Sequence, residues 1–155
     1  MNSKMLTKVA HLALAGAFLT LASALPAKAG NDPATAKIED VREAGLEKLE
    51  KLYKAGATVG YGSDLLGGLH KYQSEEFAIR GRYLPADAVI RSATVDAAKV
   101  LRMEGEIGVI APGAHADLVV VDGNPLDDLG LLASGGDHLS LILQGGKVVK
   151  QSTGV

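Results

Sequence analysis

The stretch from Lys37 to Gly62 constrains the fold most, because a long amphipathic helix there runs directly into a short strand. Apolar residues recur at helical spacing on one face of Lys37 to Ala55, namely Ile38, Val41, Leu49 and Leu52. Gly56 stands where a glycine cap ends a helix. The next residues, Ala57 to Gly62, are rich in side chains that favour a strand. A helix followed at once by a short buried strand is typical of a parallel αβ sheet.

Further helices are expected after a glycine-containing loop that spans Ser63 to Gln73. Ser74 is placed to cap a helix whose first turn carries two glutamates. Pro85 is a favourable first residue for the next helix. Thr94 is placed to cap a continuation to about Arg102. Helices on both sides of the predicted strand indicate an α/β domain.

The texture changes after Glu106, where short β-rich segments alternate with turn residues. Pro112-Gly113 and Gly145-Gly146 are the turns of two predicted hairpins. The paired segments are Gly108–Ile110 with Asp117–Asp122, and Leu139–Leu143 with Lys147–Lys150. Between the hairpins, Leu126–Leu132 is expected to form one or two helical turns. The last third is therefore predicted to be mainly antiparallel β structure.

The first 29 residues have the three parts of a signal peptide for export. Lys4 and Lys8 form a basic start, an apolar run extends from Leu12 to Leu25, and Ala27-Lys28-Ala29 is a small-x-small cleavage site. The run is shorter than the ~20 apolar residues that a membrane span needs, so cleavage would leave no stable anchor. The pattern predicts a periplasmic or secreted protein, with residues 30–36 as a polar linker. A buried first helix is the alternative.

Charge and composition exclude several classes of function. A formal net charge of -2 gives no basic field for nucleic acid. The absence of cysteine excludes disulfides, thiolate metal sites and a cysteine nucleophile. Gly60-Tyr61-Gly62 has the first two glycines of a dinucleotide-binding loop, but Leu65 stands where the third is needed. The chain is therefore expected to bind neither nucleic acid nor a dinucleotide.

Asp64 is the strongest candidate for a catalytic and metal-binding residue. It lies directly after the predicted strand, at the end where parallel αβ barrels build their active sites. A carboxylate there can ligate a cation or accept a proton from metal-bound water. A loop aspartate that caps a turn is the alternative. His70 lies six residues further along the same loop, where it either contacts a substrate in the same cleft or is simply exposed.

The other histidines and three arginines carry weaker expectations. His11 lies in the apolar N-terminal run, and no two histidines form a close ligand pair. His115 and His138 fall in predicted turns and are expected at the surface. Three arginines at helical positions could bind a substrate carboxylate, although surface ion pairs are the simpler expectation: Arg80, Arg82 and Arg91.

Four segments, taken in order, resemble the C-terminal part of the metal-dependent amidohydrolase superfamily. They are Ala55–Asp64, Ile90–Leu101 with its Arg91-Ser92-Ala93-Thr94, Gly105–Pro125 with Ala116-Asp117-Leu118-Val119-Val120 and Asp122-Gly123-Asn124-Pro125, and Leu143–Val149 with Gly145-Gly146-Lys147. Together they cover roughly residues 37–150. One segment alone would be a weak match, but the ordered set is highly specific. The stretch Gly62–Phe77 resembles most the imidazolonepropionase and prolidase-like branch.

The resemblance implies a (β/α)8 barrel with a small β-sandwich made from both chain ends. It also implies one or two divalent metal ions, usually zinc, that activate water to attack a small amide, cyclic amide or dipeptide-like substrate. Asp64 matches the family's metal-ligating carboxylate and proton acceptor. The fold class expected for this chain is α/β. Residues 37–104 would hold the last αβ unit of the barrel and the C-terminal helices, and residues 105–151 part of the β-sandwich.

The chain departs from the family in its other metal ligands. The family's first strand supplies H-x-H and its middle strands a lysine or glutamate and two further histidines, none of which can be placed in these residues. Because a catalytic zinc site takes about three protein ligands, the isolated chain is expected to bind no metal and to be inactive. Two alternatives stay open: one chain of a split hydrolase, or an exported non-enzymatic binding module. Unpaired strand edges would favour a homodimer or a complementing chain.

Overall fold

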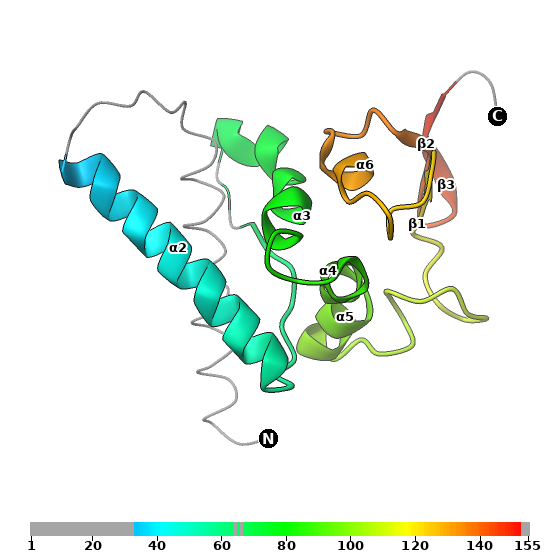
Figure 1. Ribbon diagram of the computed structural model, residues 1–155. Helices are drawn as coiled ribbons and strands as arrows, with labels where there is room; N and C mark the ends of the chain where they lie inside the picture. Colours follow the sequence, from blue (N-terminus) through cyan, green and yellow to red (C-terminus); the bar gives the residue numbers. More distant parts are fainter. Residues whose placement is uncertain (1–32, 64, 66, 153–155) are drawn as a thin grey trace.

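A computed structural model describes residues 33–63, 65 and 67–152, and Figure 1 shows their arrangement. The predicted signal peptide and residues 30–32 of the predicted linker lie outside the described residues. The elements are α2 (Pro33–Lys54), η1 (Gly67–Tyr72), α3 (Glu75–Arg80), α4 (Ala86–Ala93), α5 (Val95–Leu101), β1 (Leu118–Val121), α6 (Gly130–Ala133), β2 (Leu139–Gln144) and β3 (Lys147–Gln151). In Figure 1, α3, α4 and α5 lie between α2 and the three-stranded sheet. Within this part of the chain, no helix has the length and hydropathy of a membrane span.

Helix α2 confirms the predicted amphipathic helix and its glycine cap. It begins at Pro33, four residues before the expected start, because proline suits the first helical position. At its end, the amide of Gly56 donates to the carbonyl of Tyr53 at 2.9 Å and that of Ala57 to Leu52 at 3.0 Å. This pair of bonds is a Schellman motif, and Gly56 adopts the left-handed φ of 71° that it requires.

The segment Ala57–Gly62 is not a strand, so that prediction is wrong. It follows the Schellman turn as irregular backbone, and no strand pairs with it among the described residues. The amide of Tyr61 instead donates to the carbonyl of Ser92, at the end of α4, at 2.7 Å. The reason is that a parallel strand needs neighbouring strands from other αβ units, and the described residues provide none.

The short helices α3, α4 and α5 form where their start residues predicted them, although the capping hydroxyls act differently. Ser74 precedes α3, but its hydroxyl donates to the carbonyl of Ala133 at 3.2 Å and so connects α3 to α6. Thr94 separates α4 from α5, and its hydroxyl donates back to the carbonyl of Ile90 at 2.8 Å. Neither hydroxyl makes the predicted cap bond. Both connect neighbouring helical segments instead.

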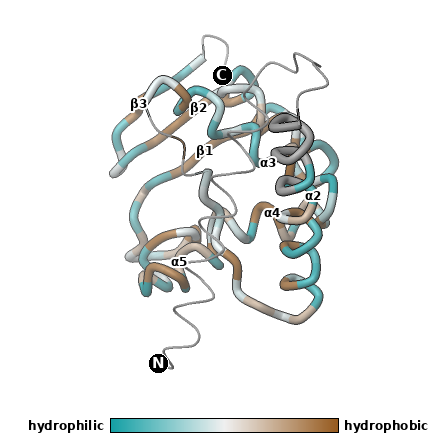
Figure 2. Tube along the Cα trace, turned by 90° about the vertical axis from the view of Figure 1, so that its left-hand side faces the viewer, coloured by the Kyte–Doolittle hydropathy of each residue, from teal (hydrophilic) through white to brown (hydrophobic). Residues whose placement is uncertain are grey.

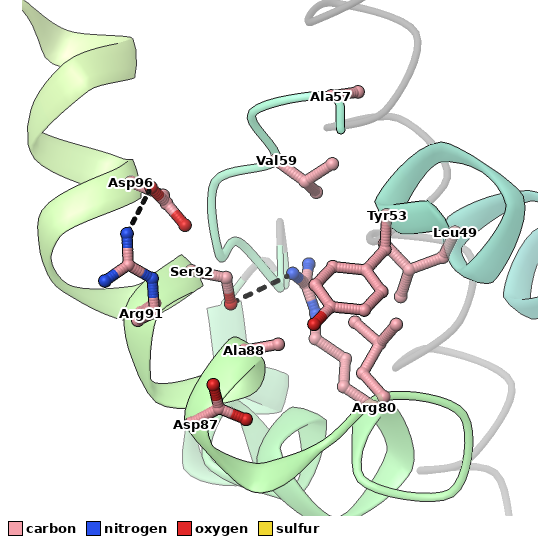
Figure 3. Close-up of a pocket in the computed structure, with 11 residues that line it drawn as sticks. Leu49, Tyr53, Ala57, Val59, Arg80, Asp87, Ala88, Arg91, Ser92 and Asp96 are labelled. Atoms are coloured by element: carbon pink, nitrogen blue, oxygen red, sulfur yellow. Dashed lines mark hydrogen bonds and ion pairs between the residues drawn. The ribbon is translucent and has the colours of Figure 1, made fainter. Parts of the chain in front are cut away.

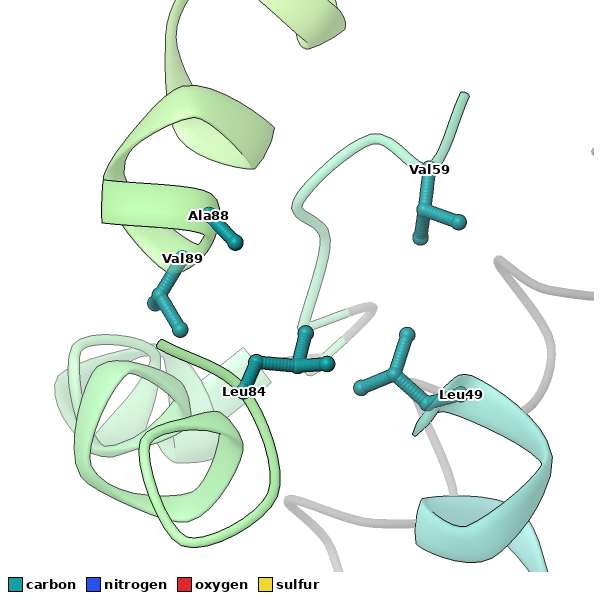
Figure 4. Packing of buried hydrophobic residues seen from close by; sticks show 5 residues of the cluster. All are labelled: Leu49, Val59, Leu84, Ala88 and Val89. Carbon is teal, nitrogen blue, oxygen red and sulfur yellow. The ribbon is translucent and has the colours of Figure 1, made fainter. Parts of the chain in front are cut away.

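The hydrophobic core packs one face of α2 against α4 and the segment between α2 and η1. Figure 4 shows its five buried members, which are Leu49, Val59, Leu84, Ala88 and Val89. Phe77 of α3 and Leu129 before α6 also pack against this group. Burying each large aliphatic side chain contributes about 1.5–3 kcal/mol. The buried side chain of Val59 therefore helps to fix the irregular segment, in addition to the backbone hydrogen bond of Tyr61.

The C-terminal third is an antiparallel sheet in the order β1-β2-β3. The predicted second hairpin is confirmed, since β2 and β3 pair across Gly145-Gly146, both with positive φ. The predicted first hairpin is wrong, because β1 pairs with β2 and Gly108–Ile110 forms no strand. A Cβ at Gly108 would lie 2.6 Å from the backbone of Thr94, so this glycine packs against the α4–α5 junction instead. The helical turn predicted in Leu126–Leu132 is found as α6.

Several valines of this sheet lie at the surface. Figure 2 shows hydrophobic residues along the strands. The exposed members on the edge strands β1 and β3 are Val119, Val120, Val148 and Val149, with exposed fractions from 44% to 57%. Among the described residues, no further strand pairs with β1 or β3, so the sheet presents two edges and an exposed apolar surface there. The described residues therefore form an α/β arrangement of helices with a small antiparallel sheet, as predicted at the level of fold class.

Candidate active site

The candidate site lies along the irregular segment that leads from α2 to Ser63. In Figure 3 this segment passes between α2 and α4, with Val59 and Ala57 on it. Asp64, the predicted catalytic residue and metal ligand, lies outside the described residues, and so does Leu66. The prediction for Asp64 therefore stays a prediction. What the structure describes is how the residues immediately before Asp64 are held.

A buried ion pair stands next to this segment. The Nε of Arg80 donates to Oε1 of Glu76 at 2.6 Å, and the two side chains are 3% and 1% exposed. The prediction of a surface ion pair for Arg80 is wrong, because α3 turns this arginine towards the core. Arg91 fits the prediction, because it is exposed and its Nη2 lies 3.8 Å from Oδ1 of Asp96 in an ion pair. Arg82 is also exposed.

The guanidinium of Arg80 reaches the segment directly. Its Nη1 donates to the carbonyl of Gly60 at 3.2 Å and to the hydroxyl of Ser92 at 3.4 Å. The hydroxyl of Ser92 in turn donates to the carbonyl of Val89 at 2.6 Å, which fixes its orientation. One arginine thus joins α3, α4 and the backbone four residues before Asp64. Each buried polar group in this cluster has a partner, as burial requires.

Tyr61 connects the segment to the far end of the loop that holds Asp64. Its hydroxyl donates to the carbonyl of Gln73 at 2.8 Å, and its ring lies 4.5 Å from that of Phe77. The guanidinium of Arg80 lies 5.1 Å from the centre of the Tyr61 ring. Burial raises the pKa of Tyr61 well above its usual range. The nearby Glu76 carboxylate raises this pKa further, and Arg80 lowers it by a smaller amount. Tyr61 is therefore neutral at physiological pH and acts as a hydrogen-bond donor.

The sequence indicated this cluster only weakly. Glu76 and Arg80 have the i,i+4 spacing with the acid first that favours an ion pair on a helix. Nothing in that spacing distinguishes a buried pair from a solvated one. Ser92 lies in the Arg91-Ser92-Ala93-Thr94 stretch that carries the family resemblance, and that stretch was the available sign of its importance.

The predicted substrate contact, His70, lies in η1 and is exposed. The hydroxyl of Tyr61 donates to the carbonyl of Gln73, three residues after His70. This bond connects the end of η1 to the segment before Asp64. His115 and His138 are both exposed, as predicted. His11 lies outside the described residues. Among the described residues, His70 is thus the histidine that the chain holds nearest in sequence to the candidate site.

A small pocket of about 100 Å³ adjoins the segment between α2 and α4 (Figure 3). Apolar residues including Leu49, Val59 and Ala88 form one part of its lining. The polar part comes from Tyr53, Arg80, Asp87, Arg91, Ser92 and Asp96. Its volume is well below the ~300–1,000 Å³ of ordinary ligand pockets, so it is too small to be a substrate site by itself.

The described residues do not form a metal centre. No group of three or more histidine, aspartate or glutamate side chains gathers within this part of the chain. The carboxylate of Glu76 is buried and bound to Arg80. A zinc site needs about three convergent ligands, so the described side chains do not fit one.

Solved structures share this arrangement of elements. An amidohydrolase crystal structure gives a TM-score of 0.76 and 42% sequence identity, with 87% of this chain matching 34% of that chain. A prolidase complexed with N-methylphosphonate-L-proline gives a TM-score of 0.75 and 45% identity, with coverage of 89% and 34%. An ochratoxinase from A. niger, at 22% identity and a TM-score of 0.66, supports the fold alone. This chain therefore spans about a third of the solved structures that it matches.

Curated relatives point to the same family. A 5-methylthioadenosine/S-adenosylhomocysteine deaminase from Symbiobacterium thermophilum is 36% identical over 90 residues, which are 50% of this chain and 21% of that protein. A deaminase of the same description from Syntrophus aciditrophicus is 26% identical over 126 residues, or 68% of this chain and 28% of that protein. The model of the amidohydrolase family matches residues 2–149. These matches confirm the resemblance of the four ordered segments, and the chain belongs to the amidohydrolase family.

Proposed function

We propose that this chain supplies the C-terminal part of a metal-dependent hydrolase that cleaves carbon–nitrogen bonds in dipeptide-like substrates. The observation that supports this most is the 45% identity, over 89% of this chain, to a prolidase complexed with a phosphonate-proline compound. A Xaa-Pro dipeptidase with bound methionine, 27% identical over 90% of this chain, agrees with the same substrate class. Members of the amidohydrolase family are generally metal-dependent.

Asp64 has the central role in this proposal, as a metal ligand and proton acceptor. It follows the anchored segment at Gly60 and Tyr61 and matches the family's aspartate in Ala55–Asp64. When bound, a zinc ion would supply Lewis-acid activation of water and of the scissile carbonyl. His70, which is exposed on η1, is proposed as a substrate contact in the same loop.

As a separate polypeptide, these 155 residues are proposed to be inactive. A catalytic zinc site takes about three protein ligands, and the sequence offers Asp64 without H-x-H or another close histidine pair. The remaining ligands would come from a further part of the barrel, on another polypeptide or in a longer chain. The edges of the sheet, which no other strand pairs with in the part of the chain that the structure describes, support such a complement.

A chimera tests the proposal. Residues 33–152 would replace the matching third of the prolidase that is 45% identical, and hydrolysis of Xaa-Pro dipeptides and bound zinc would be measured. We expect a metal-loaded chimera with activity, and loss of activity by about 100-fold or more in Asp64→Asn, which keeps the size of the side chain but removes its charge. A folded chimera that binds zinc but cleaves no dipeptide would contradict the substrate class. Dipeptide hydrolysis by the isolated chain would contradict its proposed inactivity.

Deamination of a purine nucleoside is the second candidate, because the deaminase from Symbiobacterium thermophilum is 36% identical over half of this chain. The prolidase match extends over more of the chain at higher identity, which is why hydrolysis of dipeptides is proposed first. Both activities break a carbon–nitrogen bond, so the same chimera would be assayed with 5′-methylthioadenosine. Turnover of this nucleoside without dipeptide hydrolysis would reverse the order of the two candidates.

Export through residues 1–29 is also proposed, on the basic start, apolar run and small-x-small site of this segment. Mass spectrometry of the mature protein from the periplasm or medium should give Gly30 as its first residue. A soluble cytosolic protein that retains Met1 would contradict export.

A further inference from the structure

We propose that Arg80, held by Glu76, is a positioning residue that fixes the backbone leading into Asp64. Only the last step, from the position of this backbone to catalysis, rests on the proposed function. The anchoring itself can be tested in the full chain without any assay of activity.

The contacts of Arg80 divide into a supporting contact and two positioning contacts. Glu76 accepts from Nε at 2.6 Å and balances the buried charge. The Nη1 atom reaches the carbonyl of Gly60 at 3.2 Å and the hydroxyl of Ser92 at 3.4 Å. The carbonyl of Ser92 accepts from the amide of Tyr61 at 2.7 Å. Arg80 and Ser92 thus hold two consecutive residues, Gly60 and Tyr61, that end three residues before Asp64.

Stability alone is a poor explanation for this pair. Removing two charges from water is costly, and replacing a buried ion pair by apolar residues of similar volume is often neutral or stabilising. Glu76 and Arg80 are 1% and 3% exposed, so they bear this desolvation cost almost in full. An aliphatic pair would fill the same space but could not bind the carbonyl of Gly60. The feature that only the charged pair supplies is a fixed position for the segment.

The segment needs such an anchor because the sheet pairing expected for it is missing from the described residues. Ala57–Gly62 lies between α2 and α4 without a strand partner there. Arg80 also lies 5.1 Å from the Tyr61 ring, whose hydroxyl binds the carbonyl of Gln73. The same guanidinium therefore contacts the residue that ties the two ends of the Asp64 loop together.

The test compares amide hydrogen exchange with global stability in the full-length chain. The double variant Glu76→Leu/Arg80→Met removes both charges and keeps most of the volume. We expect its free energy of unfolding in urea to equal or exceed that of the wild type. The amide of Tyr61 should nevertheless exchange about ten- to a hundredfold faster, as expected when hydrogen bonds to a charged group are lost. Arg80→Lys keeps the charge but reaches fewer acceptors. The exchange rate of its Tyr61 amide should lie between those of the wild type and the double variant.

The matched control is Arg91→Met, which removes an exposed arginine from α4 and should leave exchange at Tyr61 unchanged. The proposal is overturned if the double variant is as stable as the wild type and Tyr61 keeps its protection. It is also overturned if the wild-type amide of Tyr61 is unprotected, or if protection falls throughout the molecule in proportion to a loss of global stability.

The link to catalysis is tested in the prolidase chimera. We expect the double variant to lower kcat by about tenfold or more while KM stays within about twofold, because the reacting group is displaced and substrate binding is not. An unchanged kcat in a chimera whose Tyr61 amide has lost protection would limit Arg80 to anchoring and overturn its catalytic role. If the unmodified chimera is inactive but the exchange result holds, the proposed function fails and the anchoring stands.

Discussion

At the residue scale, Tyr61 makes one hydrogen bond through its hydroxyl and two contacts through its ring. Removing the hydroxyl leaves the two ring contacts in place. The phenol donates to the carbonyl of Gln73, while the ring packs on Phe77 and faces Arg80. Tyr61→Phe keeps the ring contacts. Because one neutral hydrogen bond contributes about 0.5–1.5 kcal/mol, we expect the variant to be less stable than the wild type by about this amount near pH 8.

The same residue predicts how this difference changes with pH. The pKa of Tyr61 is raised in the folded protein, chiefly by burial, whereas in the unfolded chain it is about 10. Its contribution to stability is therefore complete below pH ~10 and is lost as pH rises towards the folded pKa, because the unfolded phenol ionises first. Urea unfolding of both proteins at rising pH should show the gap between them narrow above pH ~10. If the difference in free energy of unfolding widens there, the folded protein favours the ionised phenol and the prediction fails. The control is Tyr53→Phe, at a side chain that is 41% exposed.

The limits of sequence analysis at this scale are visible in Arg80 and Asp64. The i,i+4 spacing of Glu76 and Arg80 predicts that the two pair, and they do. Burial depends on which face α3 turns towards Ser92 and α4, which is a tertiary property that the spacing does not contain. Asp64 was identified by its position after Gly62 and by family resemblance. Asp64 itself lies outside the described residues, so its role stays a prediction.

At the scale of elements, the end of α2 offers the cleanest test of a predicted cap. Gly56 has a φ of 71°, and a Cβ built there would meet no atom within 4 Å. Gly56→Ala therefore adds no clash and changes only the conformational energy of the left-handed residue. We expect it to lower the free energy of unfolding by about 1–2 kcal/mol.

Gly62→Ala is the matched control for that variant. A Cβ at Gly62 also meets open space, but its φ is not in the left-handed region. This substitution should be neutral or slightly stabilising, since alanine restricts the unfolded chain. Equal losses in the two variants, measured by urea unfolding, would show that the left-handed turn at Gly56 is not what limits stability.

The elements that sequence predicted correctly are those with local causes. The glycine at the end of α2, Pro85 before α4, and the Gly145-Gly146 turn all act through neighbours a few residues away. One wrong strand, Ala57–Gly62, needed partners distant in sequence. The other, Gly108–Ile110, had its predicted partner nearby, but β1 pairs with the distant β2 instead. Gly108 illustrates the reason, because its missing side chain serves a close approach to Thr94 that no local pattern indicates.

At the scale of the whole molecule, the exposed valines on the edge strands of the sheet have the largest expected effect on association in solution. Its edge strands β1 and β3 each carry two exposed valines, while β2 lies between them. Free edges with apolar side chains favour pairing with another chain. We therefore expect the protein to associate as its concentration rises, whether with itself or with a complementing polypeptide.

Lysine on an edge strand blocks such pairing at little cost to the fold, because a charged side chain at the edge would have to be desolvated in the pair. Val120→Lys and Val149→Lys, at positions that are 44% and 57% exposed, should shift sedimentation velocity profiles towards the monomer. Leu101→Lys, at a 61% exposed position on α5, removes a similar apolar surface away from the sheet and should leave the profile unchanged. If the wild type is monomeric at every concentration, or if Leu101→Lys acts as strongly as the sheet variants, then the strand edges do not drive association. The complement required by the proposed function would then have to bind away from the strand edges.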